Sequence, residues 1–280
     1  MRNIKIVADS SCDLFEVGGG STPFETAPMK ICTAEREFVD DASLDIGAMV
    51  EYLYNCKEKS RSSCPNTTDW LSAFGDADEV FCVTITSGLS GSYNSACAAK
   101  KIYEESHPGA RVFVIDSLSA GCEVTLIIEK LDACISAGMT YEEICAASTE
   151  YLGHTGLLFM LKSLKTFANN GRVSPLTAKI VGIAGICIVG RASDVGTLEP
   201  MHKCRGESHS LRTIVRELAD QGYCGGKVSI GHCENAEGAK FLSEKIAEVY
   251  PDALIEIHPF RGLCSFYAER GGILVGFEKA

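Results

Sequence analysis

Short apolar segments alternate with longer amphipathic ones through the first half of the chain, and this alternation constrains the fold more than any other feature. Segments 4–8, 80–85 and 111–115 are short and rich in strand-forming residues, so they predict strands. Segments 46–57 and 120–137 carry apolar residues at helical spacing. Strands separated by helices predict a parallel sheet that is covered by helices on both faces.

The second half has a different order of elements. Segment 156–167 has the pattern of an amphipathic helix, and another helix is expected over 176–184. Segments 186–189 and 197–202 predict a pair of strands, and 273–277 predicts a last strand. The elements expected between these are helices over 208–220 and 236–249 and strands over 227–232 and 254–258.

The length of 280 residues suits two domains of ordinary size. We therefore predict two α/β domains, with the boundary near residue 154. The first, 1–154, has a parallel sheet flanked by helices. The second, 155–280, has a smaller mixed sheet with helices. A cleft between two such domains is the default place for a ligand.

The charge balance excludes some classes of partner. The chain has 26 basic and 37 acidic residues, a net charge of −11, which argues against a surface for nucleic acid or for an anionic membrane. No apolar run approaches the length of a transmembrane segment, and Asp9 interrupts the first apolar stretch, which is unlike a signal peptide. These features predict a cytoplasmic protein with no integral membrane segment.

The fourteen cysteines are scattered and form no C-x-x-C pair, and the six histidines show no metal-binding spacing. A zinc site needs clustered ligands, and a disulfide framework is not expected in a reducing compartment. Most of the cysteines are therefore expected to be small buried apolar residues. We expect no metal and no cofactor.

The turn T-S-G-L-S-G at 86–91 is the most informative polar segment, because it ends a predicted strand and precedes a helix. Gly91 lets a ligand approach the backbone closely, and the helix that starts near Ser92 directs unpaired N–H groups to the same place. With the hydroxyls of Ser87 and Ser90, this turn predicts a site for a carboxylate or phosphate. The alternative, that Ser90 only caps the helix, stays open.

Two further segments carry candidate ligand-binding groups. Ser62 and Ser63 lie in a hydroxyl-rich segment, 60–68, which we expect to be a loop before a helix. Arg172 follows Gly171, a residue type that commonly ends helices, so its side chain is expected in a fixed place that suits an anion. Taken alone, each segment also fits an ordinary helix cap or a surface ion pair.

Groups for catalysis are sparse. The chain has no G-x-S-x-G motif, no phosphate-binding P-loop and no G-x-G-x-x-G motif. Asp9 and Asp116 follow predicted strands and would be the acid–base or metal groups of an enzyme that acts on a small phosphorylated or carboxylated metabolite. An acidic residue after a strand is also a common turn residue, and Asp9 then holds the serine turn that follows it.

Seven segments together resemble the DegV family, in its order and spacing and along nearly the whole chain. In chain order they are D-S-S-C-D-L (9–14), F-V-D-D (38–41), S-S-C-P (62–65), T-S-G-L-S-G-S-Y-N-S-A (86–96), V-I-D-S (114–117), N-G-R-V-S (170–174) and G-T-L (196–198). One such segment would be weak support, whereas the ordered set is specific.

The resemblance implies two α/β domains with a long tunnel between them that holds one long-chain fatty acid non-covalently. It implies that hydroxyls at Ser62 and Ser90 hold the carboxylate, and it ties Arg172 to the same region or to kinase docking. Some members present the carboxylate to a separate fatty acid kinase subunit, so the protein would be a carrier and not an enzyme. Many members have a histidine where this chain has Tyr267, which stays a candidate to bind the head group, while the kinase partnership stays open.

Overall fold

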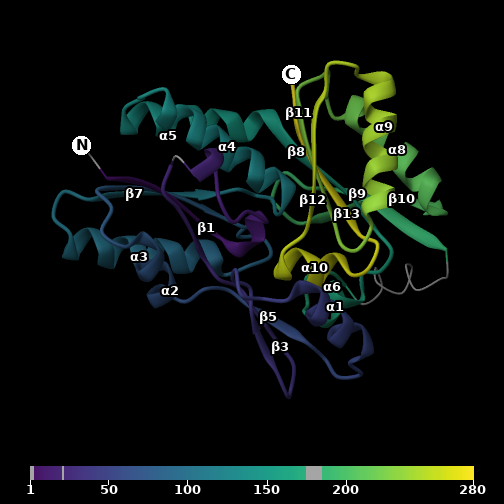
Figure 1. Cartoon of the computed structure of the whole chain (residues 1–280), viewed down its shortest axis with the longest axis horizontal. Coiled ribbons are helices and arrows are strands. Elements are labelled where there is room, and N and C mark those ends of the chain that lie inside the picture. Colours follow the sequence, from purple (N-terminus) through teal and green to yellow (C-terminus); the bar gives the residue numbers. More distant parts are fainter. Residues whose placement is uncertain (1–2, 21, 175–184) are drawn as a thin grey trace.

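The computed structural model describes residues 3–20, 22–174 and 185–280, and the strands of this part form three sheets (Figure 1). The first sheet has four strands in the order β2-β1-β6-β7, the second has six in the order β10-β9-β8-β13-β11-β12, and the third has three in the order β4-β3-β5. Within these described ranges, three short 3-10 helices connect larger elements: η1 (Ser10–Cys12), η2 (Gly18–Gly20) and η3 (Leu152–His154).

The four-stranded sheet is parallel throughout, and helices cover both of its faces (Figure 1). Ile6 and Ala8 pack against α4 and α5, whereas Val7 packs on the other face against α2 and α3. This alternation of buried residues confirms the predicted parallel sheet. Its elements are β1 (Ile4–Asp9), β2 (Phe24–Ala27), β6 (Glu79–Thr84), β7 (Arg111–Asp116), α2 (Thr67–Phe74), α3 (Ser92–Ser106), α4 (Cys122–Ser136) and α5 (Tyr141–Tyr151).

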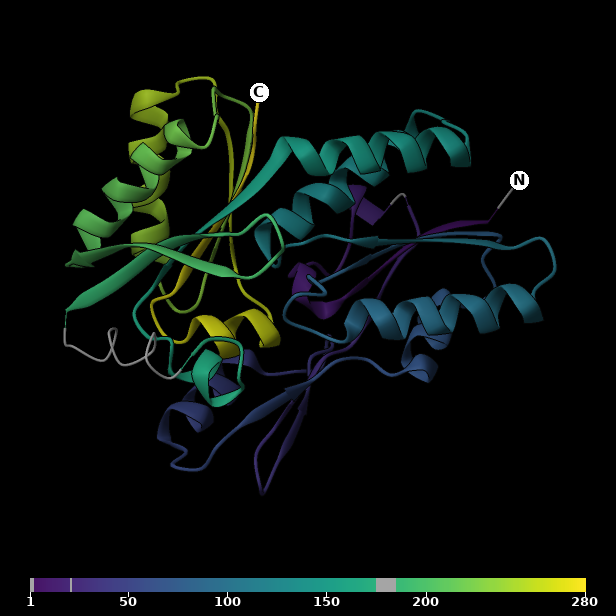
Figure 2. The ribbon, with the colours of Figure 1, turned by 180° about the vertical axis from the view of Figure 1, so that it is seen from behind.

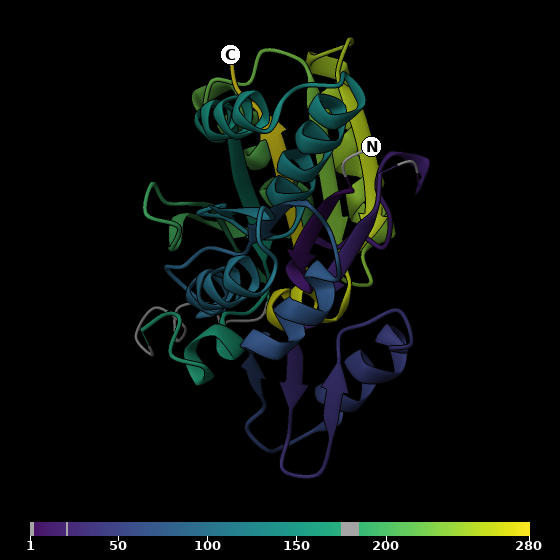
Figure 3. The same cartoon turned by 90° about the vertical axis from the view of Figure 1, so that its left-hand side faces the viewer.

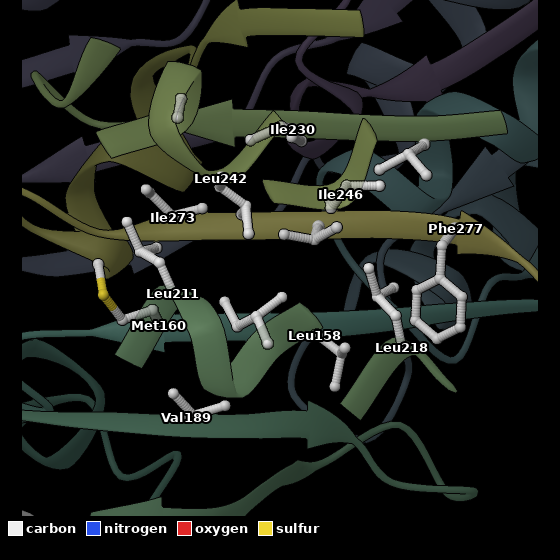
Figure 4. Close-up of a cluster of buried hydrophobic side chains, with 14 of the residues drawn as sticks. Leu158, Met160, Val189, Leu211, Leu218, Ile230, Leu242, Ile246, Ile273 and Phe277 are labelled. Atoms are coloured by element: carbon white, nitrogen blue, oxygen red, sulfur yellow. The ribbon is translucent and has the colours of Figure 1, made fainter. Parts of the chain in front are cut away.

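The six-stranded sheet is mixed, because only β11 and β12 run parallel. Helices α8 and α9 cover one face, with Leu158, Ile230 and Leu242 in the shared core (Figure 4). With six strands it is larger than the four-stranded parallel sheet. The prediction of a mixed sheet is confirmed, but the prediction that it would be the smaller of the two sheets was wrong. Its elements are β8 (Thr155–Leu161), β9 (Ile186–Ala192), β10 (Leu198–Arg205), β11 (Lys227–His232), β12 (Leu254–Pro259), β13 (Ile273–Glu278), α8 (Glu207–Asp220) and α9 (Ala236–Val249).

Helix α4 joins the two sheets, since it packs on β1 and β6 of the first sheet and on β8, β11 and β13 of the second (Figure 2). The parallel sheet ends at Asp116 and the mixed sheet begins at Thr155. The domain boundary near residue 154 stays a prediction. No helix in the described part of the chain is both long and apolar enough to cross a membrane. All fourteen cysteines are free, and most of them are buried, which confirms the expectation that they are mainly small buried residues.

The three-stranded sheet projects below the other two (Figure 3). It contains β3 (Lys30–Cys32), β4 (Glu37–Val39) and β5 (Arg61–Ser63), and it lies beside α1 (Ile46–Asn55). The prediction of a loop over 60–68 was therefore wrong for residues 61–63, which form β5. This strand pairs with β3, so that Ser62 lies opposite Ile31. This pairing places Ser62 by strand register and not by a loop conformation.

The predicted helix over 156–167 is also wrong. Its first part is β8, whose seven residues are all buried because helices cover both faces of this central strand. Its last part belongs to α6 (Lys165–Asn169). A continuous apolar run fits a buried strand as well as a helix, so periodicity does not separate them. Helix α10 (Gly262–Ala268) was not predicted, and the helix expected over 176–184 lies outside the described residues.

Candidate functional site

A cavity of about 270 Å³ lies between the loops that follow the parallel strands, helix α10 and the mixed sheet. Its walls are mainly apolar, with Ile85 and Ala120 from the loops, Leu157 and Phe159 from β8, and Leu263 from α10. Six of the seven predicted ligand-binding residues line it: Ser62, Ser63, Ser90, Gly91, Arg172 and Tyr267. The predicted polar groups, which come from distant parts of the sequence, therefore share one largely apolar cavity.

The turn between β6 and α3 contributes Ser90 and Gly91. The N–H groups of Leu89 and Ser90 donate to the carbonyl oxygen of Thr86 at 3.3 and 3.2 Å, which closes the turn. Ser90 Oγ accepts from the N–H of Ser92 at 3.2 Å, so this hydroxyl both assists the helix start and borders the cavity. The N-cap residue of α3 is Gly91, so the alternative that Ser90 is the cap was wrong, although its hydroxyl accepts from the first residue of the helix.

Ser87 lies in the same turn but is not among the residues that line the cavity. Its side chain is exposed, and its N–H donates to Asp116 Oδ1 at 3.0 Å. The structure therefore separates Ser87 from Ser90, although only three positions divide them in the sequence.

Ser62 and Tyr267 meet in the wall of the cavity. The Ser62 Oγ and Tyr267 hydroxyl oxygen atoms are 2.7 Å apart, within hydrogen-bond distance, although the residues are 205 positions apart. The N–H of Ser62 donates to Asn170 Oδ1 at 3.3 Å, and the ring of Tyr267 lies 4.7 Å from that of Phe167. Tyr267 thus brings a hydroxyl group to the cavity beside that of Ser62.

Arg172 also lines the cavity, and its guanidinium is held by carbonyl groups. Its Nε donates to the carbonyl oxygen of Leu89 at 3.1 Å, and its Nη1 donates to that of Asn170. Gly171, with φ 73°, provides the chain reversal after α6 that places Arg172 there, as the sequence predicted. Arg172 therefore connects the end of α6 to the turn that carries Ser90.

The carboxyl groups considered for catalysis lie elsewhere. Asp9 is fully buried and outside the cavity lining, and its oxygens accept from Ser11 and from the N–H of Ile85 at 2.9 Å and the hydroxyl of Ser92 at 2.6 Å. The interpretation that Asp9 holds the serine turn is confirmed. Asp116 accepts from two N–H groups and also lies outside the lining. Among the described residues, no three His, Cys, Asp or Glu side chains are grouped to hold a metal.

The sequence did not identify several residues of this site. Thr86, Thr197 and Cys64 line the cavity. Helix α10 also went unrecognised, although Leu263, Phe266 and Tyr267 follow the i, i+3, i+4 spacing of a helical face. This spacing could have predicted the helix from the sequence.

Asp13 is a buried carboxyl group beside α10, and it provides a test by pH. Burial raises the pKa of Asp13 to about 7, against an ordinary value of 3.8. Between these values the folded protein keeps a proton that the unfolded chain releases, so the contribution of Asp13 to stability falls as pH rises. We expect Asp13→Asn to lose this dependence and to gain roughly 3 kcal/mol relative to the parent protein between pH 5 and pH 8.

Urea unfolding of both proteins at several pH values measures this difference. Asparagine also tolerates the left-handed backbone of residue 13, where φ is 58°. Parallel curves of unfolding free energy against pH for the two proteins would show that Asp13 is ionised in the folded state at all these values.

The comparisons with known proteins agree with the resemblance along the chain. The family model described as an uncharacterised protein of the DegV family matches residues 3–279. A DegV domain-containing protein of Streptococcus pneumoniae is 47% identical over 276 residues, which cover 98% of each chain.

Two solved structures superpose closely on this one. One is the Streptococcus pneumoniae fatty acid kinase B3 protein loaded with linoleic acid, which is 46% identical with a TM-score of 0.96 and covers 99% of this chain and 100% of its own. The other is a DegV family protein of Eubacterium eligens loaded with heptadecanoic acid, which is 44% identical with the same TM-score and coverage. The match across the sequence and the fold shows that this chain belongs to the DegV family.

Proposed function

We propose that this protein binds one long-chain fatty acid without a covalent bond. The carboxylate lies at Ser62, Ser90 and Tyr267, and the acyl chain occupies the apolar part of the cavity. The observation that carries this proposal is a mainly apolar cavity whose lining includes Ser62, Ser90 and Tyr267, with the hydroxyl oxygens of Ser62 and Tyr267 2.7 Å apart. The fatty acids held by two relatives at 44 and 46% identity support it.

The energetics suit such a ligand. A carboxylate taken from water costs several kcal/mol unless donors surround it, and the hydroxyls of Ser62, Ser90 and Tyr267 are such donors. Each buried CH₂ group contributes roughly 0.8 kcal/mol, so the apolar walls supply affinity while the hydroxyls supply orientation. Arg172 already donates to two carbonyl oxygens, and we assign it to holding the Ser90 turn in place.

Removal of the Tyr267 hydroxyl tests the assignment of the head group. We expect Tyr267→Phe to weaken binding of a free fatty acid by about tenfold, because a hydrogen bond to a charged group is lost. Binding of the methyl ester of the same acid should change little, since the ester has no charge. Displacement of a fluorescent fatty acid measures both affinities, and Tyr54→Phe, at an exposed site on α1, is the matched control.

We further propose that the protein presents the carboxylate to a separate kinase subunit, which would place it in the cytoplasm, where ATP is available. The support is the relative described as a fatty acid kinase B3 protein. The protein loaded with oleate should support ATP-dependent formation of acyl phosphate by the catalytic subunit of a fatty acid kinase. Absence of turnover with a kinase subunit that is active on its own partner would refute the kinase role and leave fatty acid binding untouched.

A further inference from the structure

Helix α10 carries Tyr267 and also lines the cavity through Leu263, Cys264 and Ala268. It has seven residues, which is too short to be stable by itself. Its position is therefore set by its surroundings: it packs against α1, η1, β3 and α6, and side chains bind its N-terminal end.

The N-terminal end of α10 is held by side chains from the first 40 residues. One oxygen of the Asp40 carboxylate accepts from the N–H of Gly262 at 2.9 Å, and the other accepts from the N–H of Leu263 at 2.8 Å. The N–H of Arg261 donates to Asp13 Oδ1 at 2.7 Å. Two acidic side chains thus satisfy three N–H groups that would otherwise lack partners at the start of the helix.

Asp40 is itself held in place. It is fully buried, its N–H donates to the carbonyl oxygen of Met29 at 2.9 Å, and its carbonyl oxygen accepts from Arg261 Nη2 at 2.8 Å. Arg261 Nε lies 3.7 Å from Asp40 Oδ1. Asp40 does not line the cavity, so it acts on a ligand through the elements it holds, which are α10 and the backbone of Met29.

Tyr267 lies near the C-terminal end of α10, at the opposite end of the helix from the contacts with Asp40. Tyr267 is one helical turn beyond Leu263, about 6 Å along the axis. Its oxygen lies 2.7 Å from Ser62 Oγ, a distance that a small shift or rotation of the helix would break.

We propose that Asp40, with Arg261, is a positioning residue that fixes α10 so that the Tyr267 hydroxyl meets Ser62. Through this contact Asp40 sets the preference of the cavity for a charged carboxylate over an uncharged head group. The second statement rests on the proposed function, whereas the first concerns the protein alone.

Asp40→Asn is the direct test of the first statement. Asparagine offers one acceptor oxygen, and its NH₂ group would face an N–H donor, so one of the two bonds to the helix is lost. The nine tyrosines are labelled with ¹³C at Cζ, and Tyr267→Phe identifies the signal of Tyr267. We expect Asp40→Asn to shift this signal in the direction that Ser62→Ala shifts it.

The matched control is Asp45→Asn, the same substitution at the start of α1, where one carboxylate oxygen, Asp45 Oδ1, accepts from the N–H of Ala48 at 2.9 Å, and asparagine can keep that bond. It should leave the Tyr267 signal unchanged. A Tyr267 signal that is also unchanged in folded Asp40→Asn would overturn the positioning role.

A second variant, Gly262→Ala, moves α10 away from Asp40 and keeps the Asp40 carboxyl group, which Asp40→Asn replaces with an amide. A Cβ atom at Gly262 would lie 2.8 Å from Asp40 Cγ and from Leu44 Cδ2, so Gly262→Ala must push Asp40 and α10 apart. It should shift the Tyr267 signal as Asp40→Asn does, and it decides the question if Asp40→Asn does not fold.

Binding measurements test the second statement. In the parent protein, Asp40→Asn should lower the preference for palmitate over its methyl ester by about tenfold, the same loss as Tyr267→Phe. In the Tyr267→Phe background, Asp40→Asn should lower it no further. An equal loss in both backgrounds would show that Asp40 does not act through Tyr267.

The two proposals fail in different ways. If the parent protein binds neither palmitate nor oleate, the proposed function is wrong, and the Tyr267 signal still decides whether Asp40 positions α10. If it binds them and the losses add, only the role of Asp40 is wrong.

Discussion

Ser90→Ala is expected to weaken binding of a long-chain fatty acid by tenfold to a hundredfold. Ser90 Oγ borders the cavity beside the start of α3, where it is placed to donate to a carboxylate. Hydrogen bonds to charged groups contribute about 1.5–3 kcal/mol, which gives this range. The same oxygen accepts from the N–H of Ser92, so the variant should also lose stability, by less than about 2 kcal/mol.

Ser87→Ala is the matched control, because Ser87 lies in the same turn and its exposed side chain is outside the cavity lining. Affinities come from displacement of a fluorescent fatty acid, and thermal unfolding of each variant separates lost binding from lost structure. Equal affinities of Ser90→Ala and the parent protein would remove Ser90 from the head-group site.

Gly276→Ala is expected to destabilise the protein by about 3 kcal/mol or more. Gly276 lies in β13, where the start of α4 crosses the mixed sheet. A Cβ atom there would lie 2.4 Å from the carbonyl carbon of Cys122 and 2.6 Å from the nitrogen of Glu123. These are backbone atoms and cannot rotate away, so α4 would have to move away from the mixed sheet. That movement would also disturb its packing on the parallel sheet.

The matched control is Gly153→Ala in η3, where a Cβ atom would meet no other atom within 4 Å. This change should be neutral or slightly stabilising, because alanine restricts the unfolded chain more than glycine does. Urea unfolding measures both variants. A loss below 1 kcal/mol for Gly276→Ala would show that α4 and β13 approach less closely than described.

The parallel sheet was predictable because its strands and helices differ in local pattern. Ile6 and Val7 face opposite helical layers, and apolar residues recur at helical spacing in the segments between strands. The helix prediction over 156–167 was wrong because the sequence patterns of a strand and a helix do not differ there. All residues of β8 are buried, so the strand has no polar face to reveal its period.

The candidate site was predictable only in part, for a related reason. The turn that carries Ser90 ends a strand and starts a helix, and such local geometry can be inferred from glycine and serine in sequence. The pairing of Ser62 with Tyr267 depends on β5 lying beside β3 and on α10 being fixed by Asp40. These contacts span up to 223 residues, and no local pattern encodes them.

Native mass spectrometry of the purified protein, followed by mass analysis of an organic extract, tests the central claim most directly. We expect an added mass of one fatty acid per chain, or its appearance after oleate or palmitate is added to protein freed of lipid. The extract should contain the same free acid, because the proposed binding is non-covalent. Protein that carries no lipid as purified and takes up neither acid would contradict the proposed function.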